Sequence, residues 1–209
     1  MTKKLAIYGA GGFGREIALM ITQINKNKPE WNLIGFFDDT VKGTVNGYPI
    51  LGDLVKLDSW DTPLSVAIAI ANPDVRKKIR LGVINPKISF PTLIHPMSQT
   101  GDDNNTIGEG CLLTSGCILT TNVHLKNFVI VSSLTFIGHD ATIGSYTSIM
   151  PHVGLSGSVN IGESCFIGAS ACVLQNLDIG DHVTVGAGAL VTKNVDSNCT
   201  VIGVPAVSR

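Results

Sequence analysis

The chain has 209 residues, enough for one or two domains, and its formal net charge of −1 does not indicate a nucleic-acid-binding or membrane-surface protein. Charged residues make up only 15% of the chain and 23 residues are glycine, a composition that suits a glycine-cornered β solenoid. No apolar run approaches the roughly 18 residues of a membrane span, and the N-terminal residues lack a signal-peptide core. We therefore expect a cytoplasmic protein. The five cysteines show no metal-ligand spacing, so neither a disulfide nor a metal site is expected.

The first part of the chain alternates between predicted strands and helices. Strands are expected at 4–8, 32–37 and 65–70, with an amphipathic helix after the first strand and a further helix after the third. That last helix has a strong start signal, with Asn72 as the cap, Pro73 at the first helical position and Asp74 in the first turn. This order predicts a small doubly wound α/β domain at residues 1–84. Residues 85–105, rich in Pro, Asn and Asp, are interpreted as a junction.

A glycine fingerprint follows the first predicted strand. Gly9, Gly11 and Gly14 have the spacing that lets a backbone approach a diphosphate at a helix N-terminus. Asp38 and Asp39 end the second strand, where an acid can accept hydrogen bonds from a ribose or a base. The domain is Rossmann-like but has only half of the dinucleotide plan, so a mononucleotide or a nucleotide-sugar is favoured over NAD. A tight turn that binds nothing is the alternative.

The second part of the chain repeats with a period of six. Fifteen aliphatic residues follow one another at this spacing: Ile107, Leu113, Leu119, Leu125, Val131, Ile137, Ile143, Ile149, Leu155, Ile161, Ile167, Val173, Ile179, Val185 and Val191. This period fits neither an amphipathic helix nor an alternating strand, but it is typical of hexapeptide β-helices. Three hexads per turn predict about five coils within residues 106–209, closed by a C-terminal cap. A three-sided prism favours a homotrimer.

One histidine of the solenoid stands beside an acid at a predicted corner. His139 falls two places after the inward Ile137, so its ring is expected to face outward, with Asp140 next to it. A histidine can take a proton near neutral pH, and a carboxylate can orient it. The alternative is an exposed histidine without a role, since His124, His152 and His182 also lie on the solenoid.

The repeats resemble those of the hexapeptide-repeat acyltransferases, whose fold is a left-handed parallel β-helix. The resemblance rests on the unbroken hexads, Ile161-Gly-Glu-Ser-Cys-Phe-Ile-Gly168 and the terminal Val201-Ile-Gly-Val-Pro-Ala206. The glycine-rich N-terminal domain, Phe37-Asp38-Asp39, Asn46-Gly-Tyr-Pro-Ile-Leu-Gly52, Ala69-Ile-Ala-Asn72 and His139-Asp140 are similar to the sialic acid O-acetyltransferase and bacillosamine N-acetyltransferase group.

The resemblance implies a homotrimeric enzyme of glycan biosynthesis that uses acetyl-CoA and no metal. It implies N-acetylation of a nucleotide-linked 4-amino-4,6-dideoxy sugar by direct transfer, with His139 as the general base and Asp140 as its neighbouring acid. The implied nucleotide-sugar contacts are Gly11, Gly12, Phe13, Asp38, Asp39 and Ala71, and the implied acetyl-CoA contacts are Gly157, Ala169 and Ala187.

Two positions depart from the group. Ser148 stands where some relatives have a second histidine, and Val207 stands where a basic residue is usual. Three other functions remain open: O-acetylation of a sugar such as sialic acid, a non-catalytic nucleotide-sugar-binding protein, and a nicotinamide-dependent enzyme. The nucleotide, whether UDP, dTDP or GDP, is also open.

Overall fold

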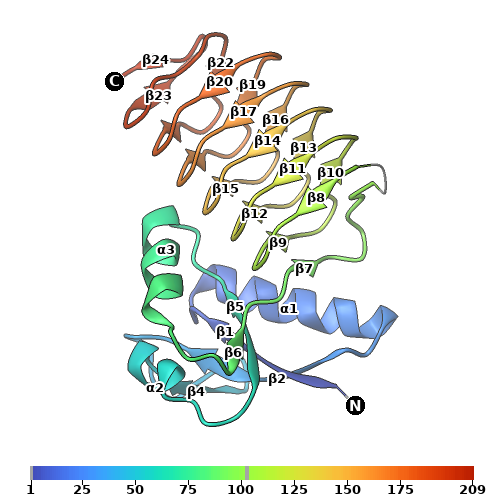
Figure 1. Cartoon of the computed structure of the whole chain (residues 1–209), viewed down its shortest axis with the longest axis vertical. Coiled ribbons are helices and arrows are strands. Elements are labelled where there is room, and N and C mark those ends of the chain that lie inside the picture. The colour runs from blue at the N-terminus through green and yellow to red at the C-terminus, as the bar shows by residue number, and fades with distance from the viewer. Residues whose placement is uncertain (1, 102–103) are drawn as a thin grey trace. The chain divides into compact units, whose positions relative to one another are not determined.

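The computed structural model describes residues 2–101 and 104–209, which form two compact units, Met1–Pro96 and Met97–Arg209. The boundary between the units falls inside the segment 85–105. In the described part of the chain, no helix is both long enough and apolar enough to span a membrane. Figure 1 shows the helices gathered in the first unit and a stack of short strands in the second.

The first unit is a six-stranded sheet with helices, as expected of a doubly wound α/β domain. Its elements are β1 (Lys3–Tyr8), α1 (Gly12–Asn27), β2 (Trp31–Phe37), β3 (Thr44–Val45), β4 (Tyr48–Gly52), α2 (Leu54–Asp58), β5 (Leu64–Ile68), α3 (Pro73–Gly82) and β6 (Ile88–Ser89), followed by β7 (Leu93–Ile94), which is not part of this sheet. The strand order of the sheet is β3-β4-β2-β1-β5-β6, and all pairs except β3–β4 are parallel.

The strand order of this sheet reverses beside its central strand. The chain passes from β1 through α1 to β2 on one side, and β5 then pairs with β1 on the other side. In open α/β sheets such a switch point, outside the carboxyl ends of the strands, is where ligands bind. The predicted start of α3 is confirmed, because the Asn72 side chain accepts a hydrogen bond from the N–H of Val75 and Pro73 is the first helical residue.

The second unit is a β solenoid with three parallel faces. Its hexad strands are β8 (Thr106–Ile107), β9 (Leu112–Leu113), β10 (Ile118–Leu119), β11 (His124–Leu125), β12 (Ile130–Val131), β13 (Phe136–Ile137), β14 (Thr142–Ile143), β15 (Ser148–Ile149), β16 (Gly154–Leu155), β17 (Asn160–Ile161), β18 (Phe166–Ile167), β19 (Cys172–Val173), β20 (Asp178–Ile179), β21 (Thr184–Val185) and β22 (Leu190–Val191). Each pairs in parallel with the strand 18 residues away, so three hexads make one coil.

The predicted count of about five coils was too low. The hexads alone account for five strands on each face, but β23 (Thr200–Ile202) adds a further parallel strand and β24 (Val207–Ser208) closes the same sheet in antiparallel fashion. Isolated parallel bridges at Gln99–Ile118 and Ile179–Val195 lengthen the other two faces. The count failed because backbone pairing continues where the aliphatic period stops.

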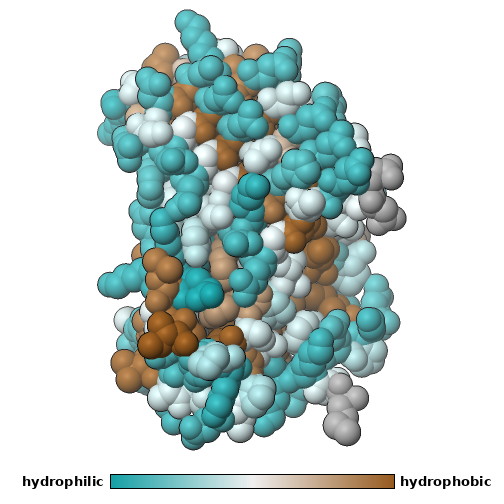
Figure 2. All heavy atoms as spheres, in the orientation of Figure 1, coloured by the Kyte–Doolittle hydropathy of each residue, from teal (hydrophilic) through white to brown (hydrophobic). Residues whose placement is uncertain are grey.

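The period identified the core of the solenoid correctly. The second residue of nearly every hexad strand is buried. Cys111, Cys117 and Cys165, each two residues before one of the aliphatic hexad residues, are also fully buried. Burial raises the pKa of Cys117 and of Cys165 to about 11, so these thiols are inert packing groups. Hydrophilic side chains cover most of the visible surface of this unit, with narrow strips of hydrophobic atoms between them (Figure 2).

Candidate functional site

Two faces of the solenoid differ in what they present outward. Because the second residue of each two-residue strand points inward, the first points outward. We call the sheet β10-β13-β16-β19-β22 the apolar face, and its outward residues are Ile118, Phe136, Gly154, Cys172 and Leu190. We call the sheet β20-β17-β14-β11-β8 the polar face, and its outward residues are Thr106, His124, Thr142, Asn160 and Asp178. On the apolar face, Ile118 and Phe136 remain 37% and 45% exposed.

His139 and Asp140 lie at the corner between these two faces, after β13 and before β14. Asp140 has the left-handed φ of 60° that tightens the corner, a conformation that Asp tolerates better than most residues. Its Oδ2 lies 2.7 Å from His139 Nδ1, so the two neighbouring side chains are paired, a contact that spacing along the chain left open. The His139 side chain is 62% exposed, and no described residue makes a hydrogen bond to its Nε2.

The sequence interpretation missed the residue that holds the other oxygen of Asp140. Asn122 Nδ2 donates to Asp140 Oδ1 over 2.8 Å. The hydrogen bond to His139, followed by the one from Asn122, lowers the pKa of the Asp140 carboxyl below its ordinary value. A signal for this contact was present, because 18 residues separate Asn122 from Asp140 and each coil has 18 residues.

Gly157 lies one coil beyond His139 at the same corner and makes room for its ring. A Cβ at this position would lie 2.4 Å from His139 Cε1 and 2.5 Å from Nε2. The Gly157 N–H makes no hydrogen bond to any described residue, while the following N–H, of Ser158, donates to the His139 carbonyl oxygen over 2.7 Å. The structure thus brings His139, Asp140 and Gly157 together.

Ala169 and Ala187 are stacked at the other corner of the apolar face, between β18 and β19 and between β21 and β22. The Gly188 N–H donates to the Ala169 carbonyl oxygen over 2.8 Å, which joins the two coils. The two corners with predicted acetyl-CoA contacts therefore border the same apolar face. Of the two departures from the group, Ser148 is fully buried and Val207 is 62% exposed.

The glycines of the N-terminal fingerprint fall into two classes. A Cβ at Gly9 would lie 2.9 Å from the Ala69 carbonyl oxygen, and a Cβ at Gly14 would lie 1.8 Å from that of Gly9, so both are required by packing. Gly11 has open space in front of it and Gly12 only the far end of Arg15, at 4.0 Å. Gly11 is the N-cap of α1 with an ordinary φ of −73° and no side-chain cap. The fold therefore does not require glycine at 11, whereas a ligand approaching the helix N-terminus would.

Asp38 and Asp39 directly follow β2, beside this fingerprint, but they accept hydrogen bonds from different groups. Asp38 accepts from the Ala10 N–H at 2.9 Å and, through its other oxygen, from the N–H and hydroxyl of Thr40 and the N–H of Val41. Burial would raise its pKa, but these hydrogen bonds outweigh burial and lower the pKa from 3.8 to about 2.

Asp39 is exposed and makes fewer contacts than Asp38. Its Oδ1 accepts from the Tyr8 hydroxyl at 2.6 Å and from the Leu54 N–H at 3.1 Å. Burial, together with the hydrogen bond to Asp39, raises the pKa of Tyr8, so its hydroxyl keeps its proton. Both carboxylate oxygens of Asp38 thus accept hydrogen bonds within the protein, whereas Oδ2 of Asp39 accepts none from the described residues.

Phe13 and Ala71 complete the predicted nucleotide-sugar set. Phe13 is half-buried in the first turn of α1, and Ala71 is half-buried between β5 and α3. The buried Arg76 donates to the carbonyl oxygens of Ile70 and Ala71, which holds the loop at the end of β5. The N-terminal residues therefore gather at the carboxyl ends of β1, β2 and β5, where the strand order reverses.

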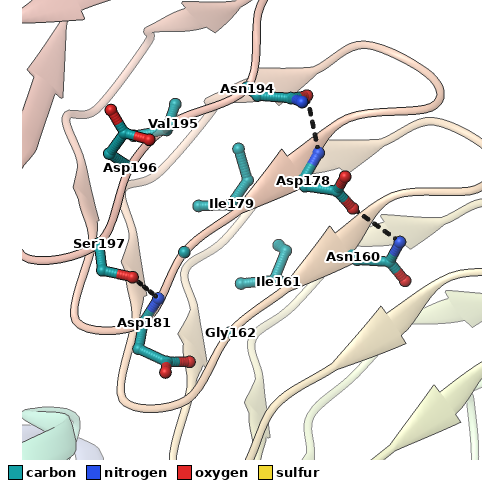
Figure 3. A pocket seen from close by; sticks show the side chains of 11 residues that line it. Asn160, Ile161, Gly162, Asp178, Ile179, Asp181, Asn194, Val195, Asp196 and Ser197 are labelled. Carbon is teal, nitrogen blue, oxygen red and sulfur yellow. Dashed lines mark hydrogen bonds between the residues drawn. The ribbon is translucent and has the colours of Figure 1, made fainter.

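A further hollow lies elsewhere on the solenoid. It has a volume of about 470 Å³, lies over β17 and β20, and is lined by Asp178, Asp181 and Asp196 (Figure 3). Two hydrogen bonds link its rim: Asn160 Nδ2 donates to Asp178 Oδ1, and the Asp181 N–H donates to Ser197 Oγ. Three carboxylates would repel a phosphate-bearing ligand, and the hollow shares no residue with the predicted sites. Within the described residues, no group of three or more His, Cys, Asp or Glu side chains could hold a metal ion.

Comparison with known proteins agrees with this geometry. Residues 4–80 match the PglD N-terminal domain family, and residues 158–193 match the bacterial transferase hexapeptide family of six repeats. The chain is 31% identical over 173 residues to a GDP-perosamine N-acetyltransferase of Escherichia coli O157:H7, covering 82% of this chain and 78% of that relative.

Solved structures match the full length of the chain. The acetyltransferase domain of PglB from Neisseria gonorrhoeae FA1090, in complex with acetyl coenzyme A, is 31% identical with a TM-score of 0.92, and both chains are covered completely. WeeI from Acinetobacter baumannii AYE is also 31% identical, with complete coverage of both chains and a TM-score of 0.89. This chain belongs to the hexapeptide-repeat acetyltransferases that carry a PglD N-terminal domain.

Proposed function

We propose that this acetyltransferase moves the acetyl group of acetyl-CoA to the amino group of a nucleotide-linked 4-amino-4,6-dideoxy sugar. The observation that carries the proposal is the His139–Asp140 pair. One ring nitrogen is engaged by the carboxylate at 2.7 Å, and the other has no hydrogen-bond partner among the described residues. An exposed, oriented imidazole on an acetyltransferase solenoid is suited to general-base catalysis.

The reaction proceeds by direct transfer. With the proton of the neutral imidazole on Nδ1, facing Asp140, the lone pair of Nε2 is available to take a proton from the attacking amine. The amine nitrogen bonds to the thioester carbonyl carbon, the carbon–sulfur bond breaks, and CoA leaves as a thiolate that recovers the proton from His139. The free N–H of Gly157 beside the ring is available to the oxyanion that forms at the carbonyl.

The nucleotide-linked part of the substrate is assigned to the carboxyl edge of the sheet in the first unit. Gly11 and Gly12 leave the N-terminus of α1 open to a diphosphate, with Phe13 and Ala71 beside it. Asp39 supplies an acceptor for a base or ribose, and Asp38 shapes the loop next to it. The name of the E. coli relative makes GDP-perosamine the first substrate to test.

Acetyl-CoA is assigned to the apolar face. Gly157 on one border and Ala169 and Ala187 on the other are predicted to contact its thioester and pantetheine arm. The same proposal includes a left-handed coil, a cytoplasmic location and assembly into a homotrimer. In the homotrimer, a second copy of the chain would cover this face.

The test is a thiol-release assay with acetyl-CoA and a panel of GDP-, UDP- and dTDP-linked 4-amino sugars, with sialic acid as a hydroxyl acceptor. His139→Ala is expected to lower kcat by about 10²–10⁴-fold without changing the melting temperature. His182→Asn, at an exposed corner of the same solenoid, is the control and should retain full activity. Near-normal turnover by His139→Ala would refute the general base, and release of CoA only with sialic acid would refute the amino-sugar acceptor.

A further inference from the structure

The His139–Asp140 pair is exposed, yet it is held from the coils on both sides. The Asp140 N–H donates to the Thr121 carbonyl oxygen over 3.0 Å, and the His139 carbonyl oxygen accepts from the Ser158 N–H. These bonds hold the backbone of the pair but leave the carboxylate free to rotate. The side-chain bond from Asn122 Nδ2 to Asp140 Oδ1 removes that freedom.

We propose that Asn122 is a positioning residue for catalysis, acting through Asp140 on the His139 imidazole. This inference rests on the proposed function of His139. The Asn122 amide occupies one carboxylate oxygen and thereby aims the other at Nδ1, which keeps the proton on Nδ1 and the lone pair on Nε2.

A purely conformational role for Asn122 must be separated from this one. Its φ is 55°, in the left-handed region where Asn is favoured, so the corner could select Asn for its backbone alone. Glycine adopts the same φ without strain but has no amide. Asn122→Gly therefore removes the hydrogen bond and keeps the corner, whereas Asn122→Asp keeps the size and places a repelling carboxylate beside Asp140.

The experiment compares Asn122→Gly, Asn122→Asp and the control Asn198→Gly, which changes an exposed Asn with a φ of 63° at another corner. Asn122→Gly should lower kcat about tenfold, the lower end of the range seen when a residue that orients a metal-binding histidine is removed. The KM values for both substrates should stay within about twofold of the wild type. Asn122→Asp should lower kcat further. Asn198→Gly should keep wild-type kcat.

A double mutant and an NMR spectrum test whether Asn122 acts on His139 through the Asp140 carboxylate. If Asn122 acts through the carboxylate, Asn122→Gly added to Asp140→Ala should cause no further loss. Nitrogen-15 NMR of the His139 ring should show one tautomer, with the proton on Nδ1, in the wild type and a mixture of tautomers in Asn122→Gly. Multiplicative losses, a raised KM with unchanged kcat, or wild-type turnover of Asn122→Gly would each overturn the proposal. Wild-type turnover of Asn122→Gly together with an inactive His139→Ala would leave the general base in place, and an active His139→Ala would overturn both.

Discussion

The two predicted sites use glycine for opposite reasons. At the solenoid corner, the missing side chain of Gly157 makes room for the protein's own His139 ring, within 2.4 Å of where a Cβ would be. At the start of α1, Gly11 and Gly12 face open space or the end of a flexible side chain. A glycine without close neighbours in the protein leaves room for a ligand. The comparison predicts that one glycine controls the catalytic group and the others control ligand access.

Among the changes that test this comparison of glycines, Gly157→Ala has the largest expected effect. The added methyl group would lie within 3.0 Å of three atoms of the His139 ring, so the ring must shift from its present place. A displacement of about 1 Å costs on the order of 10²-fold in rate, and we expect a loss of this size in kcat. Binding of the free nucleotide, measured by calorimetry, should stay at the wild-type value. Full turnover by this variant would contradict the steric role of Gly157.

The second-largest expected effect is that of Gly12→Ala, which should leave folding intact and weaken binding of the nucleotide-sugar. Alanine is favoured over glycine in a helix, so the free energy of unfolding should stay equal or rise by up to about 1 kcal/mol. KM for the nucleotide-sugar should rise about tenfold, or about 1.4 kcal/mol, because a methyl group blocks the approach to the helix N-terminus. Gly14→Ala is the contrasting variant, since its Cβ would lie 1.8 Å from the Gly9 carbonyl oxygen and should destabilise the unit. Unchanged KM in Gly12→Ala would show that no ligand comes close to this turn.

The smallest effect concerns Asp38, whose carboxylate accepts hydrogen bonds from three backbone N–H groups, those of Ala10, Thr40 and Val41. Its pKa is about 2 in the folded protein against an ordinary 3.8, so its contribution to stability is present above about pH 4. This contribution is lost as the pH falls through about 2. Urea unfolding at pH 7, 4 and 2.5 should therefore show Asp38→Asn less stable than the wild type at pH 7, with a difference that shrinks in acid.

The control for Asp38 is Asp61→Asn, a change to an exposed acid whose carboxylate makes no hydrogen bond to a described residue. It should leave stability unchanged at each pH. A stability difference for Asp38→Asn that stays constant from pH 7 to 2.5 would show that titration of this carboxylate does not contribute.

The hexad period predicted the solenoid, its inward track and the corner at His139, because a repeat of six leaves one consistent way to bury the aliphatic residues. The same period did not predict the full number of coils, since Gln99, Val195 and β23 pair through backbone groups outside the hexad register. In the first unit, the order of strands and helices predicted the doubly wound sheet. The sequence could not separate Asp38 from Asp39, because their roles depend on N–H groups from distant parts of the chain.

The sequence by itself therefore determined which residues are buried, where the chain turns and which family the repeats resemble, since these follow from local periodicity and turn chemistry. Only the tertiary structure decided which side chains meet. Asn122 reaches Asp140 because parallel coils stack in register 18 residues apart, and Gly157 lies under His139 for the same reason. Hydrogen bonds and steric fit depend on distances of a few tenths of an ångström, which spacing along the chain does not specify.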